Sequence, residues 1–177
     1  MLDSIVSTKS FDKATGLWSR TGWRVRAAEL IAGAPAHVVL VLVRLHRDDA
    51  ETVVSAALTS MFGSVPPLRA GLRRLGGLVS SLQARLKRRR PLQGKTLEHA
   101  VGYYDSQCVA LVAEVDLASA GRLVVRDVRA RLKQAGVLCS IGSAVGAGVE
   151  LPALLAEAEQ DLQFEEITAD LLAPDGG

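Results

Sequence analysis

The chain has 177 residues, 49% of them hydrophobic but only 4% aromatic, and its formal net charge is +2. This length fits one domain with short tails, whose core must be built mainly from Leu, Val and Ala. No apolar run is long enough to cross a bilayer, and the N-terminus lacks the pattern of a signal peptide. A cytoplasmic location is therefore expected.

The first predicted elements are a helix, a strand and a second helix. The helix from about Trp18 to Ile31 has a partial apolar face and ends at a segment that contains Gly and Pro. The stretch from His37 to Leu45 is nearly all apolar, as is typical of a central strand covered on both faces. The second helix runs from Asp48 or Asp49, either of which is a good N-cap, to about Met61.

A basic segment comes next. From Leu68 to Arg90 leucines recur mostly three or four residues apart, which predicts an amphipathic helix, although Gly76 and Gly77 each weaken its middle by roughly 1 kcal/mol. Its eight basic residues, with no acid among them, are Arg69, Arg73, Arg74, Arg85, Lys87, Arg88, Arg89 and Arg90. Four interpretations stay open: a solvated helical face, nucleic-acid contact, contact with an anionic membrane, or an acidic protein partner.

The second half of the chain begins with a hairpin. Residues 100–112 read as a short apolar strand, a polar turn at Asp105-Ser106-Gln107 and a second strand. A helix from about Ala118 to Gln134, a strand from Val137 to Ser143 and a helix from Leu151 to Leu162 follow. Two α/β halves around an antiparallel sheet predict an α+β sandwich of the ferredoxin-like kind.

The end of the chain is acidic. The seven acids after Glu150, with no base among them, are Glu157, Glu159, Asp161, Glu165, Glu166, Asp170 and Asp175. Because the basic and acidic segments are separate, each is expected to form a surface of one sign. The acidic segment, in the same molecule or in another, is one candidate partner of the basic helix.

Two motifs add to this order of elements. Asp12, Thr15, Gly16, Leu17 and Arg20 form D-x-x-T-G-L-x-x-R at the start of the first helix, and Ser140-Ile141-Gly142 forms a short motif in the last strand. With the order of elements, these motifs resemble the GGDEF domain of diguanylate cyclases over residues 10–166. The resemblance implies a nucleotide-cyclase-like sheet flanked by helices, tails at 1–9 and 167–177, and a partly inserted basic stretch at 66–94. It also implies packing roles for both motifs and a setting in bacterial cyclic di-GMP signalling.

Members of that family join two GTP molecules, and carboxylates hold the Mg²⁺ that phosphoryl transfer needs. Where the family's first strand ends in D-x-D, this chain has Arg44-Leu45-His46. The GGDEF turn aligns with Tyr104-Asp105-Ser106-Gln107-Cys108. Tyr104 and Asp105 replace the two glycines, and the neutral Ser106 and Gln107 replace the two acids. Recruiting Asp105 for the metal would need a rebuilt turn, because a one-residue shift reverses the face of a strand.

Other substrate-contacting positions differ as well. The resemblance places Glu166 where the family has a phosphate-contacting lysine, and residues 47–60 lack the family's base-recognition motifs. The family's product site, R-x-x-D, aligns with Lys95-Thr96-Leu97-Glu98. Lysine lacks the planar two-point donor geometry of arginine, so a solvated surface pair of Lys95 and Glu98 is the favoured interpretation.

Cysteines and histidines indicate no further chemistry. In the strand order that the fold implies, Cys108 and Cys139 lie on strands that are not neighbours, so both are expected to be free, buried thiols. The three histidines, His37, His46 and His99, are scattered, and no Cys/His cluster has zinc spacing. Neither a metal nor another cofactor is expected.

These substitutions lead to a functional hypothesis. The chain is interpreted as a catalytically inactive GGDEF-like domain, a regulatory or scaffold module that acts through a protein partner or as a homodimer. The alternative is a non-catalytic receptor for GTP or cyclic di-GMP. Two further hypotheses are a divergent active cyclase and binding of nucleic acid or an anionic membrane by the basic helix.

Overall fold

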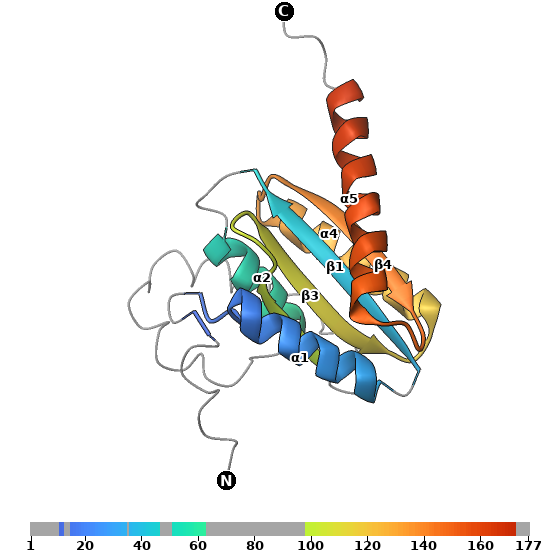
Figure 1. Ribbon diagram of the computed structural model, residues 1–177. Helices are drawn as coiled ribbons and strands as arrows, with labels where there is room; N and C mark the ends of the chain where they lie inside the picture. Colours follow the sequence, from blue (N-terminus) through green and yellow to red (C-terminus); the bar gives the residue numbers. More distant parts are fainter. Residues whose placement is uncertain (1–10, 13–14, 35, 47–50, 63–97, 173–177) are drawn as a thin grey trace, which may run out of the picture.

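The computed structural model describes residues 11–12, 15–34, 36–46, 51–62 and 98–172. Within these ranges the chain forms four helices and one four-stranded antiparallel sheet of order β2-β3-β1-β4 (Figure 1). The elements are α1 (Arg20–Gly33), β1 (His37–Leu45), α2 (Glu51–Phe62), β2 (His99–Tyr103), β3 (Cys108–Val115), α4 (Ala118–Gln134), β4 (Cys139–Gly146) and α5 (Leu151–Leu172). The predicted α+β sandwich is confirmed.

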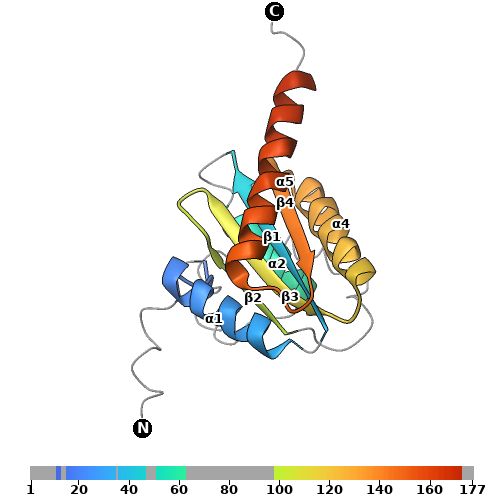
Figure 2. The ribbon, with the colours of Figure 1, turned by 45° about the vertical axis from the view of Figure 1, so that its right-hand side comes forward.

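Strand β1 lies in the middle of the sheet and is buried on both faces. Its side chains alternate, so Val39, Val41 and Val43 point to the face covered by α2 and α4. Leu40 and Leu42 point to the opposite face, which α1 and α5 cover (Figure 2). This double covering explains why the strand reads as a continuous apolar run, and its predicted bounds match the structure.

The segment before α1 covers the outer edge of β2. The Trp18 amide donates to the Val101 carbonyl at 3.1 Å, and the Tyr103 amide donates to the Trp18 carbonyl at 2.9 Å. A side chain at Gly102 would collide with Trp18, because an added Cβ would lie 2.7 Å from its Cβ. The edge strand is thereby paired, which removes a template for aggregation.

The predicted motif before α1 is part of this packing. Gly16 has a φ of 72°, which favours glycine. Thr15 is buried, its carbonyl accepts from the Ser55 hydroxyl at 2.6 Å and its hydroxyl accepts from Tyr103 at 3.0 Å. Leu17 is buried with the α2 and α4 core, whereas Arg20 is exposed at the first residue of α1.

Helix α5 lies directly on β4. A Cβ added at Gly142 would be 2.6 Å from the Leu162 amide nitrogen and closer still to the Ala158 carbonyl oxygen. The glycine therefore permits backbone-to-backbone contact between the helix and the strand, which gives Ser140-Ile141-Gly142 its packing role.

Several predicted boundaries differ from the structure, most of all the end of α5. Helix α5 continues to Leu172, ten residues beyond the predicted end and past the expected domain limit at 166, and it extends beyond the sheet (Figure 1). Apolar residues continue at helical spacing after Leu162, at Phe164 and Ile167, and helix-forming residues lie between them, so the chain stays helical. Strand β4 runs to Gly146 instead of Ser143 because its pairing with β1 continues to Val38.

Some of the remaining predictions are confirmed, and others concern residues outside the described ranges. Cys108 and Cys139 are free and lie on β3 and β4, which are separated by β1, as expected; Cys108 is buried and Cys139 is half-buried. The basic stretch 66–94, Asp48 and Asp49 fall outside the described residues. None of the helices in the described ranges combines the length and apolar character needed to cross a membrane.

We expect Gly142→Ala to destabilise the domain by about 1–3 kcal/mol, because α5 must move off β4 to admit the methyl group. The control is Gly33→Ala at the end of α1, where an added Cβ meets no atom within 4 Å. That change should be neutral or slightly stabilising. Urea denaturation of both variants measures the effect; equal midpoints would show that the close contact carries no stability.

Candidate functional site

The positions that the resemblance assigns to the active site gather at one end of the sheet. Arg44, near the end of β1, lies between Cys108 on β3 and Ser140 on β4. The next residue, Leu45, donates its amide to the Gln107 carbonyl of the hairpin turn at 2.8 Å. The chain therefore brings together the strand end, the turn and, through Glu166, the helix α5.

Arg44 and Glu166 form an ion pair. The Arg44 Nη1 lies 3.3 Å from Glu166 Oε1 and 3.2 Å from Oε2. The two side chains are 36% and 24% exposed, so screening limits the contribution of the pair to roughly 1 kcal/mol or less. These two residues are 122 positions apart in the sequence, but in the folded protein their charges neutralise each other.

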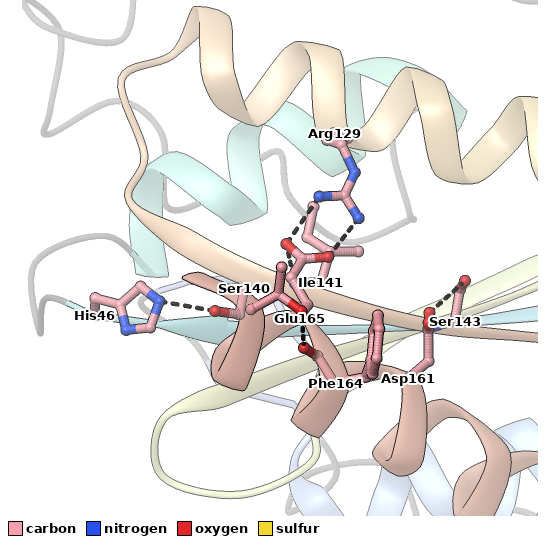
Figure 3. A network of polar contacts seen from close by, with 9 residues as sticks. His46, Arg129, Ser140, Ile141, Ser143, Asp161, Phe164 and Glu165 are labelled. Atoms are coloured by element: carbon pink, nitrogen blue, oxygen red, sulfur yellow. Dashed lines mark hydrogen bonds and ion pairs between the residues drawn. The ribbon is translucent and has the colours of Figure 1, made fainter. Parts of the chain in front are cut away.

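His46 is held by the neighbouring strand. Its Nε2 lies 3.0 Å from the Ser140 hydroxyl, and its amide donates to the Leu138 carbonyl at 3.2 Å (Figure 3). Ser140 itself is buried, so the contact fixes one side of the imidazole against β4.

The only acid of the hairpin turn, Asp105, accepts a hydrogen bond within the turn itself. Asp105 Oδ1 accepts a hydrogen bond from the Gln107 amide at 2.8 Å, which is an Asx-type turn. Ser106 and Gln107 are exposed at its tip. Among the described residues, no three His, Cys, Asp or Glu side chains come close enough together to hold a metal ion.

Tyr104 fills space between the hairpin and two helices. Its hydroxyl donates to Glu159 on α5, its ring meets Trp23 edge-on at 6.3 Å, and the Arg24 guanidinium lies 5.8 Å from the ring centroid. The hydrogen bond to Glu159, followed by burial, raises the pKa of Tyr104. A large anchored side chain thus stands where the resemblance implies a glycine that phosphate could approach.

Acids on α5 also close the outer edge of β4. The Ile141 amide donates to Glu165 Oε1 at 3.2 Å, and the Ser143 amide donates to Asp161 Oδ2 at 2.8 Å. Arg129 of α4 holds the same Glu165 at two points, at 2.8 and 2.6 Å (Figure 3). These carboxylates satisfy backbone donors that an edge strand otherwise presents to other chains.

This arrangement corrects one part of the sequence interpretation. Four of the seven acids predicted to form a surface have partners inside the domain: Glu159, Asp161, Glu165 and Glu166. The spacing of Asp161 and Glu165, four residues apart on one helix face, was the available signal. Nothing in the sequence alone names their partners.

The predicted product-site pair is only partly described. Lys95 lies outside the described residues, as does the whole basic segment. Glu98 is exposed and lies 3.5 Å from Arg26 of α1. An exposed pair of this kind contributes little to stability.

Both thiols sit in environments that disfavour the thiolate. Burial, reinforced by the charge of Asp105, raises the pKa of Cys108 to about 12. Burial and Glu165 raise the pKa of Cys139 to about 11. At neutral pH both thiols are protonated, so neither is poised as a nucleophile.

Comparison with known proteins identifies the fold. No family model and no curated protein matches the sequence. Among solved structures, the GGDEF domain of FimX from Pseudomonas aeruginosa is similar at 10% identity and a TM-score of 0.56, covering 90% of this chain and 94% of that one. The GGDEF domain of DgcB from Caulobacter crescentus, in complex with c-di-GMP, covers 90% of this chain and 91% of its own at 13% identity and a TM-score of 0.52.

A third similar structure is the diguanylate cyclase SiaD from Pseudomonas aeruginosa, in complex with its activator SiaC. It is 14% identical with a TM-score of 0.53; the match covers 90% of this chain and 60% of the SiaD chain. Together these likenesses establish a GGDEF-like fold for this chain.

The Cys108 thiol makes stability depend on pH in a defined direction. The folded-state pKa of about 12 lies above the ordinary value of 9.0, so its stabilisation is complete below pH 9 and declines as pH rises towards 12. In that window we expect wild type to lose stability more steeply than Cys108→Ala, by at most about 1.4 kcal/mol per pH unit for one proton. Urea denaturation between pH 8 and 11 measures both slopes. Parallel slopes would contradict the assignment.

Proposed function

We propose that this domain is a catalytically inactive GGDEF-like module that acts by binding a protein partner or a second copy of itself. The ion pair between Arg44 and Glu166 is the observation that carries the proposal. The resemblance implies a metal carboxylate at the first position and a phosphate-binding lysine at the second. In this chain Arg44 and Glu166 carry the opposite charges to those implied, and the two side chains pair with each other.

The electrostatics of this end of the sheet support the proposal. Mg²⁺ bound to a triphosphate needs free carboxylates, and the triphosphate needs cations. Asp105 is engaged in its own turn and Arg44 is engaged by Glu166. Tyr104 and Glu159 occupy the space beside the turn, so bringing a nucleotide there would require breaking contacts that hold α5.

Exposed apolar side chains favour a protein partner. Phe164 and Ile167, in the second half of α5, are 70% and 59% exposed. A large apolar side chain in water is a common anchor of protein interfaces. The SiaD structure, in which a similar fold is bound to a protein, is consistent with this mode of action.

The alternative is a receptor that binds GTP or cyclic di-GMP without turnover. The DgcB structure, which contains c-di-GMP, favours this second candidate. In this chain the corresponding positions would be Lys95 and the exposed Glu98, a pair that lacks the two-point grip of arginine.

We expect no cyclase turnover. Purified protein incubated with GTP and Mg²⁺ or Mn²⁺ should give no cyclic di-GMP above a no-protein control when the products are separated by chromatography. The double variant Ser106→Asp with Gln107→Glu should also be inactive, because the Arg44–Glu166 pair remains. An active GGDEF cyclase assayed in parallel verifies the conditions. Product made by the wild-type protein would refute the proposal.

Calorimetric titration separates the two candidates. With GTP or cyclic di-GMP as titrant, the partner-binding proposal predicts no binding in the sub-micromolar range, since the lysine at 95 offers only a point charge. Sub-micromolar binding of cyclic di-GMP that disappears in Lys95→Ala would establish the receptor instead. Lys133→Ala, on the exposed face of α4, removes the same charge and serves as the control variant.

A further inference from the structure

Helix α4 carries a row of basic side chains along its solvent face. Arg122, Arg126, Arg129 and Lys133 are spaced four, three and four residues apart, which places them on one side of the helix. All four are exposed, and the Arg126 side chain is 72% exposed. We call these four residues the α4 stripe.

The position of the stripe follows from how α4 packs. Val124, Val128 and Leu132 are buried against the sheet, so the stripe cannot turn inwards. The only acid on the helix is Asp127, and its contact with Arg126 is a loose one of 3.7 Å. Like charges at this spacing repel one another, so the row is unfavourable for the isolated helix. A partner of opposite sign would relieve that repulsion.

One member of the stripe already shows the chemistry that it binds. Arg129 grips the carboxylate of Glu165 with two parallel hydrogen bonds of 2.8 and 2.6 Å. Glu165 projects from another helix, α5, so the contact is a helix-borne carboxylate docked on the stripe (Figure 3). In the described part of the chain, Arg122 and Lys133 have no such carboxylate, and Arg126 has only the loose contact with Asp127.

The surface beside the stripe favours a protein over a nucleic acid. Leu123, three residues before Arg126, is 45% exposed and offers an apolar contact. Helix α4 has no aromatic residue on which a base could stack, and the nearby Glu165 and Asp127 would repel phosphates.

We propose that the α4 stripe docks an acidic helical segment of a protein partner, with carboxylates at matching helical spacing opposite Arg122, Arg126 and Lys133 and an apolar side chain against Leu123. This rests on the proposed function, for which it names a surface and the chemistry of the partner. Arg129, which lies between Arg126 and Lys133 in the stripe, stays bound to Glu165 of the domain itself.

The test uses the full chain and a synthetic helical peptide with Glu at the spacing of the stripe and one Leu. A scrambled peptide of equal composition is the peptide control. The stripe variant is Arg122→Gln, Arg126→Gln and Lys133→Gln, which spares Arg129. A charge-matched variant changes Arg20, Arg24 and Arg26 of α1 to Gln. Circular dichroism confirms that both variants are folded.

We expect fluorescence anisotropy to show that the stripe variant binds the peptide about tenfold or more weakly than wild type, since several modest surface pairs are lost together. The α1 variant should bind like wild type, and the scrambled peptide should bind wild type more weakly. Because the chain also has basic residues between 69 and 90, the difference between the variants decides the question.

Three results would overturn the docking proposal. The first is equal peptide binding by all proteins, or none by any. The second is tighter binding of single-stranded DNA than of the peptide, lost only in the stripe variant. The third is a change in the oligomeric mass of the protein in the stripe variant, which would mean that the stripe binds a second copy. Failure here leaves the proposed inactivity untouched, because that is measured by the GTP assay.

Discussion

The contact between α5 and β4 at Gly142 is the constraint on which the rest of the arrangement depends. Because position 142 has no side chain, the helix backbone lies directly on the strand. At that distance Asp161 and Glu165 reach the outward amides of Ser143 and Ile141. The next residue of α5, Glu166, reaches Arg44 on the neighbouring strand. A single close approach thus closes the open edge of the sheet and neutralises a cation at its end.

The residues that build the GGDEF-like fold make a different kind of contact from those that depart from the GGDEF pattern. Thr15, Gly16 and Gly142 make contacts that the backbone path requires, so their side chains are fixed by packing. Arg44, Glu166 and Tyr104 instead have partners among one another or on α5. At this end of the sheet Arg44 and Tyr104 are therefore both engaged by acids of α5.

The sequence predicts most of the fold because its local signals agree with the tertiary structure. Strand β1 is an unbroken apolar run, and α4 ends before Gly136, whose φ is 73°. The prediction is incomplete where the cause is non-local. Beyond Leu162 the apolar residues of α5, Phe164 and Ile167, are exposed instead of packed in the core, and Arg44 pairs with a residue 122 positions away. Residue types reveal that charges have changed, but only the fold shows which charges meet.

The charge distribution has a different meaning in the folded domain than along the chain. In the sequence, a basic segment and an acidic end look like two surfaces that could attract each other. In the structure, the acids of α5 largely serve the domain's own backbone and side chains, so their capacity to attract a partner is reduced. In the α4 stripe, Arg129 binds the carboxylate of Glu165 on α5. Since exposed charge on a rigid helix is what an oppositely charged partner recognises, the α4 stripe is the surface at which the proposed acidic partner would dock.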